Sequence, residues 1–312
     1  SCMKGTFPCS NSTKCLPRMF VCNGHKDCPE GDDESRLTCI DVHASDYMDN
    51  FIHKYNATEY EHCELSNVPL DCNCTHFTWL SCQYLGLTEI PQNVSTNVNR
   101  MILTNNSIVL TPGAFKRYKL DFLHLGRNEI EELPIGVFEG QDTLKRLMLS
   151  YNKLTTIGSG VLRDLRQLQW LMILYNKLSY IDLRDLKYLN LTWIELSNNK
   201  LTFEGQMFPE LPNLKQLSIE NNSIEVIEEF TFANLVALNN LDLRENKIRY
   251  IHPYAFRRLV NLERLDLMKN ELKTLSSTIF HDMHGLSKLN LASNPMQYIP
   301  EDLFRVKTLL SL

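Results

Sequence analysis

Carboxylate side chains are concentrated near the start of the chain, where Asp27, Asp32, Asp33 and Glu34 lie within eight residues of one another. Like charges this close repel one another unless a cation lies among them, and carboxylate oxygens are ligands that Ca²⁺ prefers. Residues 1–40 contain too few large apolar side chains to offset the entropy of ordering the chain. We therefore expect a calcium-stabilised module here, and the alternative is a solvated acidic loop.

All ten cysteines precede residue 83, in one group of six and one of four. Even-numbered groups beside N-x-S/T sequons are typical of disulfides formed in the secretory pathway, so we expect an extracellular protein. Spacing alone leaves the pairing open, and zinc is the alternative for the group of four. The cysteines are Cys2, Cys9, Cys15, Cys22, Cys28, Cys39, Cys63, Cys72, Cys74 and Cys82. The expected glycosylation sites are Asn11, Asn56, Asn93, Asn105, Asn190 and Asn221.

One further sequon, at Asn73, lies between two cysteines, and we expect it to be inaccessible. The chain has no nucleophile elbow, phosphate-binding loop or H-E-x-x-H motif, so we do not expect an enzyme. His281-x-x-His284 can place two imidazoles on one helical face, but surface decoration is the favoured interpretation. The net charge of −5 argues against nucleic acid as a partner.

Most of the chain is a repeat with the pattern L-x-x-L-x-L-x-x-N-x-L, as in Leu238–Ile248. Each copy predicts a short strand and a turn that cannot bury its apolar side alone, so the copies must stack. Asparagine at the ninth position can bond backbone groups in the turn. A Phe about ten residues later is expected to fill the convex side. Copies begin at Val98, Leu120, Leu144, Leu168, Leu191, Leu214, Leu238, Leu262 and Leu286.

The repeats predict an α/β leucine-rich repeat solenoid whose concave face is a parallel sheet, formed by nine copies over residues 98–312 and the start of a tenth. Positions three, five and seven of each copy face this concave side. A natural array is not expected to stop at a raw apolar edge, so we expect the chain to be part of a longer protein. Large apolar and acidic residues gather in the middle copies: Trp170, Met172, Trp193, Glu195, Glu220, Asp242 and Asp266.

Two segments connect the acidic module to the array. Residues 41–62 are expected to be a linker with a short helix near 46–55, whose apolar stripe includes Tyr47, Phe51 and Tyr55. The stripe either packs on the neighbouring cap or waits for a ligand. Residues 63–97 resemble the cysteine-rich N-terminal cap of extracellular leucine-rich repeat proteins, which covers the apolar end of the first repeat. This resemblance implies the disulfides Cys63–Cys74 and Cys72–Cys82.

Residues 1–40 resemble the LDL-receptor class A module in three motifs: F-P-C from Phe7, C-N-G-H-K-D-C from Cys22 and G-D-D-E from Gly31. The resemblance implies the disulfides Cys2–Cys15, Cys9–Cys28 and Cys22–Cys39. It also implies a calcium ion held by the side chains of Asn23, Asp27, Asp33 and Glu34 and by the carbonyls of Phe20 and His25. The family usually has Asp where Asn23 stands.

The order of class A module, aromatic linker, cap and about ten repeats resembles the ectodomain of the relaxin family peptide receptors, which are G-protein-coupled receptors. This resemblance implies that the repeats capture an insulin/relaxin-like hormone and that the module and linker relay activation to a seven-helix domain in the plasma membrane. Hormones of this kind present arginines and an apolar residue. We expect Glu195, Glu220 and Asp242 to receive the arginines, with Asp266 at the margin, and Trp170 and Trp193 to pack on the apolar residue. The alternative for the acids is that they only pair with the neighbouring Arg244 and Arg264. The alternative is an adhesion or matrix protein that binds without signalling.

Overall fold

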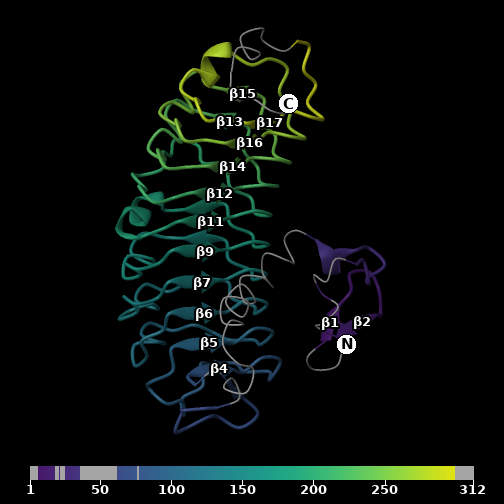
Figure 1. Ribbon diagram of the computed structural model, residues 1–312. Coiled ribbons are helices and arrows are strands. Elements are labelled where there is room, and N and C mark those ends of the chain that lie inside the picture. Colours follow the sequence, from purple (N-terminus) through teal and green to yellow (C-terminus); the bar gives the residue numbers. More distant parts are fainter. Residues whose placement is uncertain (1–5, 18–20, 22–24, 36–61, 76, 299–312) are drawn as a thin grey trace.

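A computed structural model describes residues 6–17, 21, 25–35, 62–75 and 77–298. In residues 62–298 the chain coils into a curved solenoid with one strand per turn on its inner side (Figure 1). The nine strands of the repeats are Arg100–Ile102 (β5), Phe122–His124 (β6), Arg146–Met148 (β7), Trp170–Met172 (β9), Trp193–Glu195 (β11), Gln216–Ser218 (β12), Asn240–Asp242 (β14), Arg264–Asp266 (β16) and Lys288–Asn290 (β17). The predicted leucine-rich repeat fold is confirmed.

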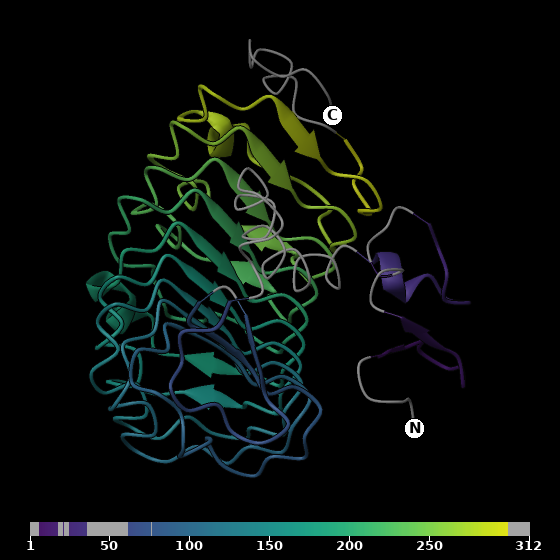
Figure 2. The same cartoon turned by 60° about the horizontal axis from the view of Figure 1, so that its bottom comes forward.

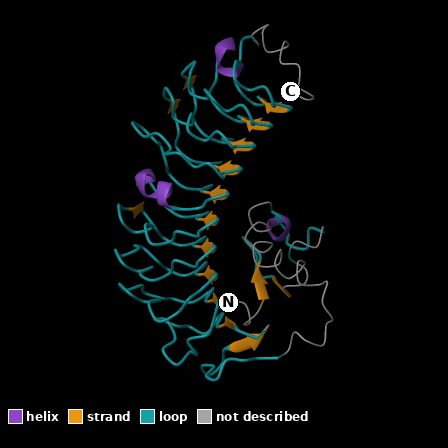
Figure 3. Cartoon of the chain, turned by 60° about the vertical axis from the view of Figure 1, so that its left-hand side comes forward, coloured by secondary structure: helices purple, strands orange, loops and turns teal. Residues whose placement is uncertain are grey.

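The main sheet has eleven strands in the order β17-β16-β14-β12-β11-β9-β7-β6-β5-β4-β3. All pairs are parallel except β3 (Asn73–Thr75) with β4 (Trp79–Ser81), which is antiparallel. The central residue of each repeat strand, such as Leu217 or Leu241, is buried toward the core. The residues before and after it therefore face the concave side, where the strands lie in a row (Figure 3).

The predicted asparagine ladder is present, and it joins neighbouring repeats. Asn246 donates from Nδ2 to the carbonyls of Ile219 (3.0 Å) and Leu243 (3.1 Å), and its Oδ1 accepts from the N–H of Ile224 (3.1 Å). The residue before each ladder asparagine has a left-handed backbone, as in Tyr175 with φ 50°. This conformation turns the chain inward, and it was not predicted from the sequence.

The outer side of the solenoid is filled by buried phenylalanines, as expected from their spacing. Phe208 stacks on Phe232 at 5.5 Å between ring centroids, and Phe232 stacks on Phe256 at 5.8 Å. Short parallel pairs lie lateral to the main sheet, seen in Figure 2: Thr156–Ile157 (β8) with Tyr180–Ile181 (β10), and Val226–Ile227 (β13) with Tyr250–Ile251 (β15). Two 3₁₀ helices complete the array, Leu183–Tyr188 (η3) and Ser277–Phe280 (η4).

The N-terminal cap of the array is closed by the disulfides Cys63–Cys74 and Cys72–Cys82, as the resemblance implied. The zinc alternative is wrong because all four thiols are oxidised. Strand β4 pairs with β5, and Leu80 and Cys82 are completely buried. The cap therefore covers the end of the first repeat.

The class A module contains the antiparallel pair Thr6–Pro8 (β1) with Cys15–Pro17 (β2) and the 3₁₀ helix Asp32–Glu34 (η2). Its described core is small and includes the disulfide Cys9–Cys28 together with Leu16. Cys15 is also disulfide-bonded, but Cys2, Cys22 and Cys39 lie outside the described residues. The expected helix near 46–55, with Tyr47, Phe51 and Tyr55, lies outside them too. Among the helices that the structure describes, none is long and apolar enough to cross a membrane.

Candidate ligand-binding site

The register of the parallel strands arranges the concave side chains in two rows. Each strand contributes its first and third residue, and in-register neighbours stand side by side. The row of first residues runs Trp170, Trp193, Gln216, Asn240, Arg264 and Lys288. The row of third residues runs Met172, Glu195, Ser218, Asp242, Asp266 and Asn290. All of the sequence-predicted ligand residues except Glu220 thus lie in these two rows, and Glu220 follows β12 by two residues and contacts Arg244.

The earlier half of this face is apolar. Phe122, Met148, Met172 and Leu174 form a buried cluster separate from the main core, and Trp170 and Trp193 pack against it. The two indoles contact edge to face at 5.4 Å between centroids. Phe122 and Met148 were not predicted to belong to the site. Their signal was available in the sequence, because Phe122 is position three of the second repeat and Met148 is position five of the third, on the same concave rows.

Arginine side chains lie between the aromatic rings of this half. The guanidinium of Arg100 stacks over Trp79 at 3.8 Å from the ring centroid and over Phe122 at 4.4 Å. The guanidinium of Arg146 lies 4.6 Å from the centroid of Trp170. Cation–π contacts of this kind hold long side chains flat on the sheet. Contacts with neighbouring aromatic rings therefore hold Arg100 and Arg146 in place on the concave face.

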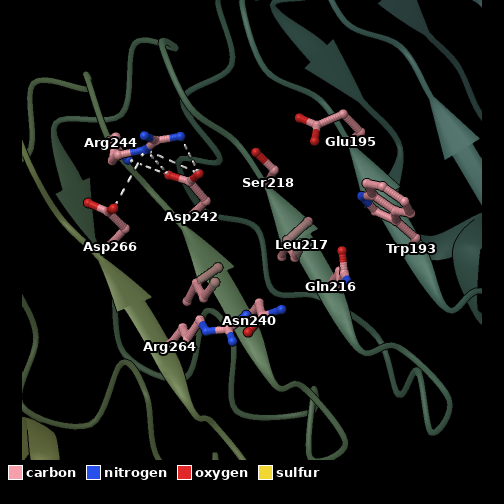
Figure 4. Close-up of a pocket in the computed structure, with 11 residues that line it drawn as sticks. Trp193, Glu195, Gln216, Leu217, Ser218, Asn240, Asp242, Arg244, Arg264 and Asp266 are labelled. Carbon is pink, nitrogen blue, oxygen red and sulfur yellow. Dashed lines mark hydrogen bonds and ion pairs between the residues drawn. The ribbon is translucent and has the colours of Figure 1, made fainter. Parts of the chain in front are cut away.

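The later half is acidic, and three carboxylates approach one guanidinium; Figure 4 shows two of them, Asp242 and Asp266, beside Arg244. Arg244 Nη2 lies 2.8 Å from Glu220 Oε2 and 2.8 Å from Asp242 Oδ2, and Arg244 Nε lies 3.7 Å from Asp266 Oδ2. Counted over these four side chains alone, three negative charges and one positive charge sum to a formal charge of −2. The cluster can accept a further cation.

Burial and neighbouring charge shift the acid–base behaviour of this cluster. Burial alone disfavours the charged form of Arg244, yet Asp242, Glu220 and Asp266 raise the pKa of its guanidinium above the ordinary value. Burial raises the pKa of the Asp266 carboxyl, although the N–H of Met268 and the amide of Asn290 bond to it. Ionised Asp266 is therefore under-compensated, which favours an incoming positive charge.

The alternative that these acids only pair with Arg244 and Arg264 is correct for Arg244 and wrong for Arg264. Arg244 pairs with all three, but Arg264 makes no ion pair with any of them in the described structure. Among the described residues, Arg244 is thus the arginine that pairs with the acidic cluster, and three carboxylates contact its single positive charge.

Glu195 differs from the other acids because it is completely buried. Its Oε1 accepts hydrogen bonds from the backbone N–H of Ser197 (3.3 Å) and from the Ser197 hydroxyl, which in turn contacts the Ser218 hydroxyl at 2.8 Å. The expectation that Glu195 receives a basic residue stays a prediction.

A pocket of about 280 Å³ lies between the apolar and acidic halves. Its walls include Trp193, Glu195, Asp242 and Arg264, and the strand residues Leu217 and Leu241 line it as well. Pockets for whole drug-sized molecules begin near roughly 300 Å³. This pocket therefore fits one or two side chains of a larger ligand that covers the face.

The acidic module fits a calcium ion in its donor chemistry. Asp33 is completely buried, and its two oxygens accept the N–H groups of Asp27 (2.6 Å) and Cys28 (3.0 Å). A carboxylate oxygen can accept through more than one lone pair, and Ca²⁺ takes oxygen ligands of this kind. Asp32 Oδ1 is buried without a hydrogen-bond partner, and the Asp32 and Asp33 carboxylates approach each other within 4.8 Å. Of the implied ligand set, Phe20 and Asn23 lie outside the described residues, whereas His25, Asp27, Asp33 and Glu34 lie within them.

The predicted glycosylation sites differ in exposure. Asn11, Asn93 and Asn221 are exposed, Asn105 and Asn190 are half-buried, and Asn56 lies outside the described residues. The expectation that the sequon between two cysteines is inaccessible is wrong. Asn73 is exposed, because it lies on β3, whose partner β4 covers only one of its edges.

The two histidines that could share a helical face, His281 and His284, do not lie on a common helix. His281 follows the last residue of η4, and its Nδ1 lies 2.9 Å from Asp282 Oδ1. Both His281 and His284 are exposed. The surface interpretation agrees with this placement.

Comparisons with known proteins agree with both parts of the chain. The family profile described as "Leucine rich repeat" matches residues 118–178, 142–201, 212–272 and 260–312. The profile described as "Low-density lipoprotein receptor domain class A" matches residues 1–39.

Two relaxin receptors are among the similar curated proteins. Relaxin receptor 2 of Canis lupus familiaris is 35% identical over 153 residues, which cover 48% of this chain and 17% of that protein. Relaxin receptor 1 of Homo sapiens is 36% identical over 138 residues, which cover 41% and 18%. The matches thus span less than a fifth of these relatives.

Solved structures support the fold alone. A chain of the complex of Latrophilin 3, Unc5D and FLRT2 superposes with a TM-score of 0.63 at 22% identity, covering 77% of this chain and 82% of that one. A chain of the TLR13–ssRNA13 complex gives a TM-score of 0.61 at 23% identity, covering 67% and 31%.

Proposed function

Because the chain belongs to the leucine-rich repeat family and has the module order of a relaxin receptor ectodomain, we propose that its concave face binds an insulin/relaxin-like peptide hormone. The observation that carries this proposal is the acidic cluster around Arg244, with its formal charge of −2, beside the Trp170–Trp193 pair. A hormone with arginines and an apolar residue on one surface is complementary to this arrangement. The proposed role is binding rather than catalysis.

The size of the site agrees with such a ligand. Trp170 begins β9 and Asp266 ends β16, with β11, β12 and β14 between these two strands. Four steps of about 4.8 Å between strands give roughly 19 Å. A compact peptide of about 50 residues has a diameter near 25 Å, so it covers the apolar and acidic halves together.

The acids and the tryptophans have separate roles in this proposal. Asp242 and Glu220 bond the hormone's guanidinium groups, with Asp266 at the margin and Glu195 within the pocket wall. Trp170, Trp193 and Met172 exclude water from the hormone's apolar side chain. Arg244 is held by Asp242 and Glu220, so it fixes the geometry in which their carboxylates are presented on the concave face.

The decisive experiment measures the affinity of a labelled relaxin-family peptide. Asp242→Asn keeps the shape of the side chain and removes its charge, and a charge-assisted hydrogen bond is worth about 1.5–3 kcal/mol. We expect the affinity to fall roughly 10- to 100-fold. Glu225→Gln is the matched control, because Glu225 also pairs with an arginine, Arg249 at 2.9 Å, but on the lateral side of the array.

Two results would count against the proposal. A loss below threefold for Asp242→Asn, Glu220→Gln and Glu195→Gln together would place the hormone elsewhere. An equal loss for Glu225→Gln would mean that overall charge, and not the concave site, governs binding.

We further propose that the module and the linker relay hormone binding to a seven-helix domain at the plasma membrane. The similarity to relaxin receptors supports this part, and the alternative is an adhesion or matrix protein without signalling. Calcium, when bound, would neutralise the carboxylates around Asp33 and stabilise the module. Asp33→Asn in the full-length receptor should then unfold the module and abolish signalling while the hormone affinity stays within about twofold. Undiminished signalling by this variant, with an unfolded module shown by loss of calcium-dependent stability, would contradict the relay.

A further inference from the structure

We infer that Arg264 and Lys288 form an anion-binding element of the concave face, and that the bound peptide carries an acidic side chain about one helical turn from its basic residue. This inference rests on the proposed function, because it assigns a second determinant to the same ligand. It concerns residues that neither the acidic cluster nor the tryptophan pair uses.

Arg264 and Lys288 begin the neighbouring strands β16 and β17 and are in-register partners. Both are exposed. Within the described ranges neither side chain makes an ion pair or a hydrogen bond, whereas Arg244 is bound to three carboxylates. Two like charges on strands about 4.8 Å apart repel each other, and an anion placed between them relieves that repulsion.

Arg264 belongs to the same pocket as the acids but lies at its opposite side. It lines the pocket together with Asp242, Arg244 and Asp266. Figure 4 shows Arg264 beside Asn240 at the starts of their strands, whereas Asp242 and Asp266 point toward Arg244 at the other end. The pocket is thus polarised along the strand direction, basic where the strands begin and acidic where they end.

The spacing of the two charges defines the ligand. Arg264 and Asp266 are two residues apart on one strand and face the same side, which separates their positions by roughly 6.6 Å. Side chains three or four residues apart on a helix are separated by about 5–6 Å. A helix with an acidic residue one turn from a basic residue can therefore satisfy both ends of the pocket at once.

This arrangement gives the face a means of discrimination. A peptide whose binding surface carries only positive charges can pair with the acids of the pocket, but Arg264 and Lys288 repel it. This repulsion lowers its affinity. A peptide with the acidic residue in place gains a second charge-assisted contact. The basic pair therefore selects among hormones that share the same arginines, and it fixes which way the helix runs across the strands.

The test is a double-mutant cycle with a labelled relaxin-family peptide and a series in which each Asp or Glu of the peptide is replaced by Asn or Gln. We expect Arg264→Glu to lower the affinity at least tenfold and Lys288→Glu to act in the same direction. One peptide substitution should weaken binding to the wild-type protein about tenfold and have no further effect on Arg264→Ala. Arg249→Glu is the control, because Arg249 is an exposed arginine directly before β15, on the lateral side of the array, and its reversal changes the net charge equally.

The outcomes separate this inference from the proposed function. If Asp242→Asn weakens binding but Arg264→Glu and Lys288→Glu stay within threefold of the wild type, the hormone site stands and the anion-binding element is refuted. If every acidic substitution in the peptide acts equally on wild type and Arg264→Ala, the element is refuted as well. If the wild-type protein binds none of the peptides, both ideas fail together. Melting curves of Arg264→Ala exclude unfolding as the cause of any loss.

Discussion

Replacing Arg244 by Met removes the only positive charge that the described structure places among Glu220, Asp242 and Asp266. The side chain keeps its bulk, so the main effect is electrostatic. Arg244 makes two contacts of 2.8 Å to carboxylate oxygens and one of 2.9 Å from Nε to Asp242 Oδ1. The carboxylates that remain are 14–29% exposed, so water compensates them only in part.

The magnitude follows from the contacts. Charge-assisted hydrogen bonds are worth about 1.5–3 kcal/mol each, and breaking a well-buried ion pair costs about 3–5 kcal/mol. Partial exposure reduces this, so we expect a loss of about 2–4 kcal/mol in the free energy of unfolding. For an array of this size the melting temperature then falls by roughly 5–15 °C.

Thermal and urea unfolding at neutral pH give the overall loss, and hydrogen exchange shows where it occurs. The strands β12, β14 and β16 should exchange faster, while β5 and β6 should be unaffected, because solenoid repeats contact only their neighbours. Adding Asp242→Asn to Arg244→Met should recover part of the stability by removing one uncompensated charge. A melting temperature within about 1 °C of the wild type, or no recovery in the double variant, would refute the electrostatic account.

Two other predictions test stability. Asn246→Ala leaves the N–H of Ile224 without its acceptor and should lower the free energy of unfolding in urea by about 2–4 kcal/mol. Asn213→Ala is the control, because it removes only an exposed hydrogen bond to Asn190 and should change stability little. Equal losses of stability in the two variants would show that the ladder does not stabilise the array. Burial raises the pKa of Asp266 above its ordinary value, so the folded state binds the proton more tightly than the unfolded state, and stability falls as pH rises through this range. Asp266→Asn should therefore raise the melting temperature at neutral pH, with the gain shrinking toward about pH 4. Asp142→Asn should behave in the opposite way, because the hydrogen bond from Lys119 lowers the pKa of Asp142, and its stabilisation is present above the ordinary pKa and lost as pH falls. If the change in melting temperature depended on pH in the same direction for both variants, the opposite pKa shifts of Asp266 and Asp142 would be refuted.

The repeat spacing predicted the strands, their parallel register and the asparagine ladder, because these depend on backbone periodicity and on one residue type. The disulfides Cys9–Cys28, Cys63–Cys74 and Cys72–Cys82 followed from resemblance and not from spacing. Which residues share the concave face was also predictable, since positions three and five of successive strands must align.

The sequence could not predict which of several possible partners a long side chain contacts in the folded protein. Both Arg244 and Arg264 are near the acids in the sequence, yet in the described structure only Arg244 pairs with them. Asp242 lies two residues before Arg244, at the end of β14, and Glu220 lies on the neighbouring repeat. The burial of Glu195 and the left-handed turn before each ladder asparagine are also products of tertiary packing.

The asparagine ladder makes each repeat depend on the one that follows it. Asn128 accepts from the N–H of Ile108 in the preceding repeat, Asn152 accepts from Ile130, and the pattern continues to Asn294, which accepts from Leu272. The bonding is directional, so the last repeat of any shortened version lacks the following asparagine that would accept its N–H. A shortened version cut just before a ladder asparagine would fray, whereas one extended past it would close its last turn. For protein engineering, the permissible cutting points are therefore spaced one repeat apart and are marked by the asparagines themselves.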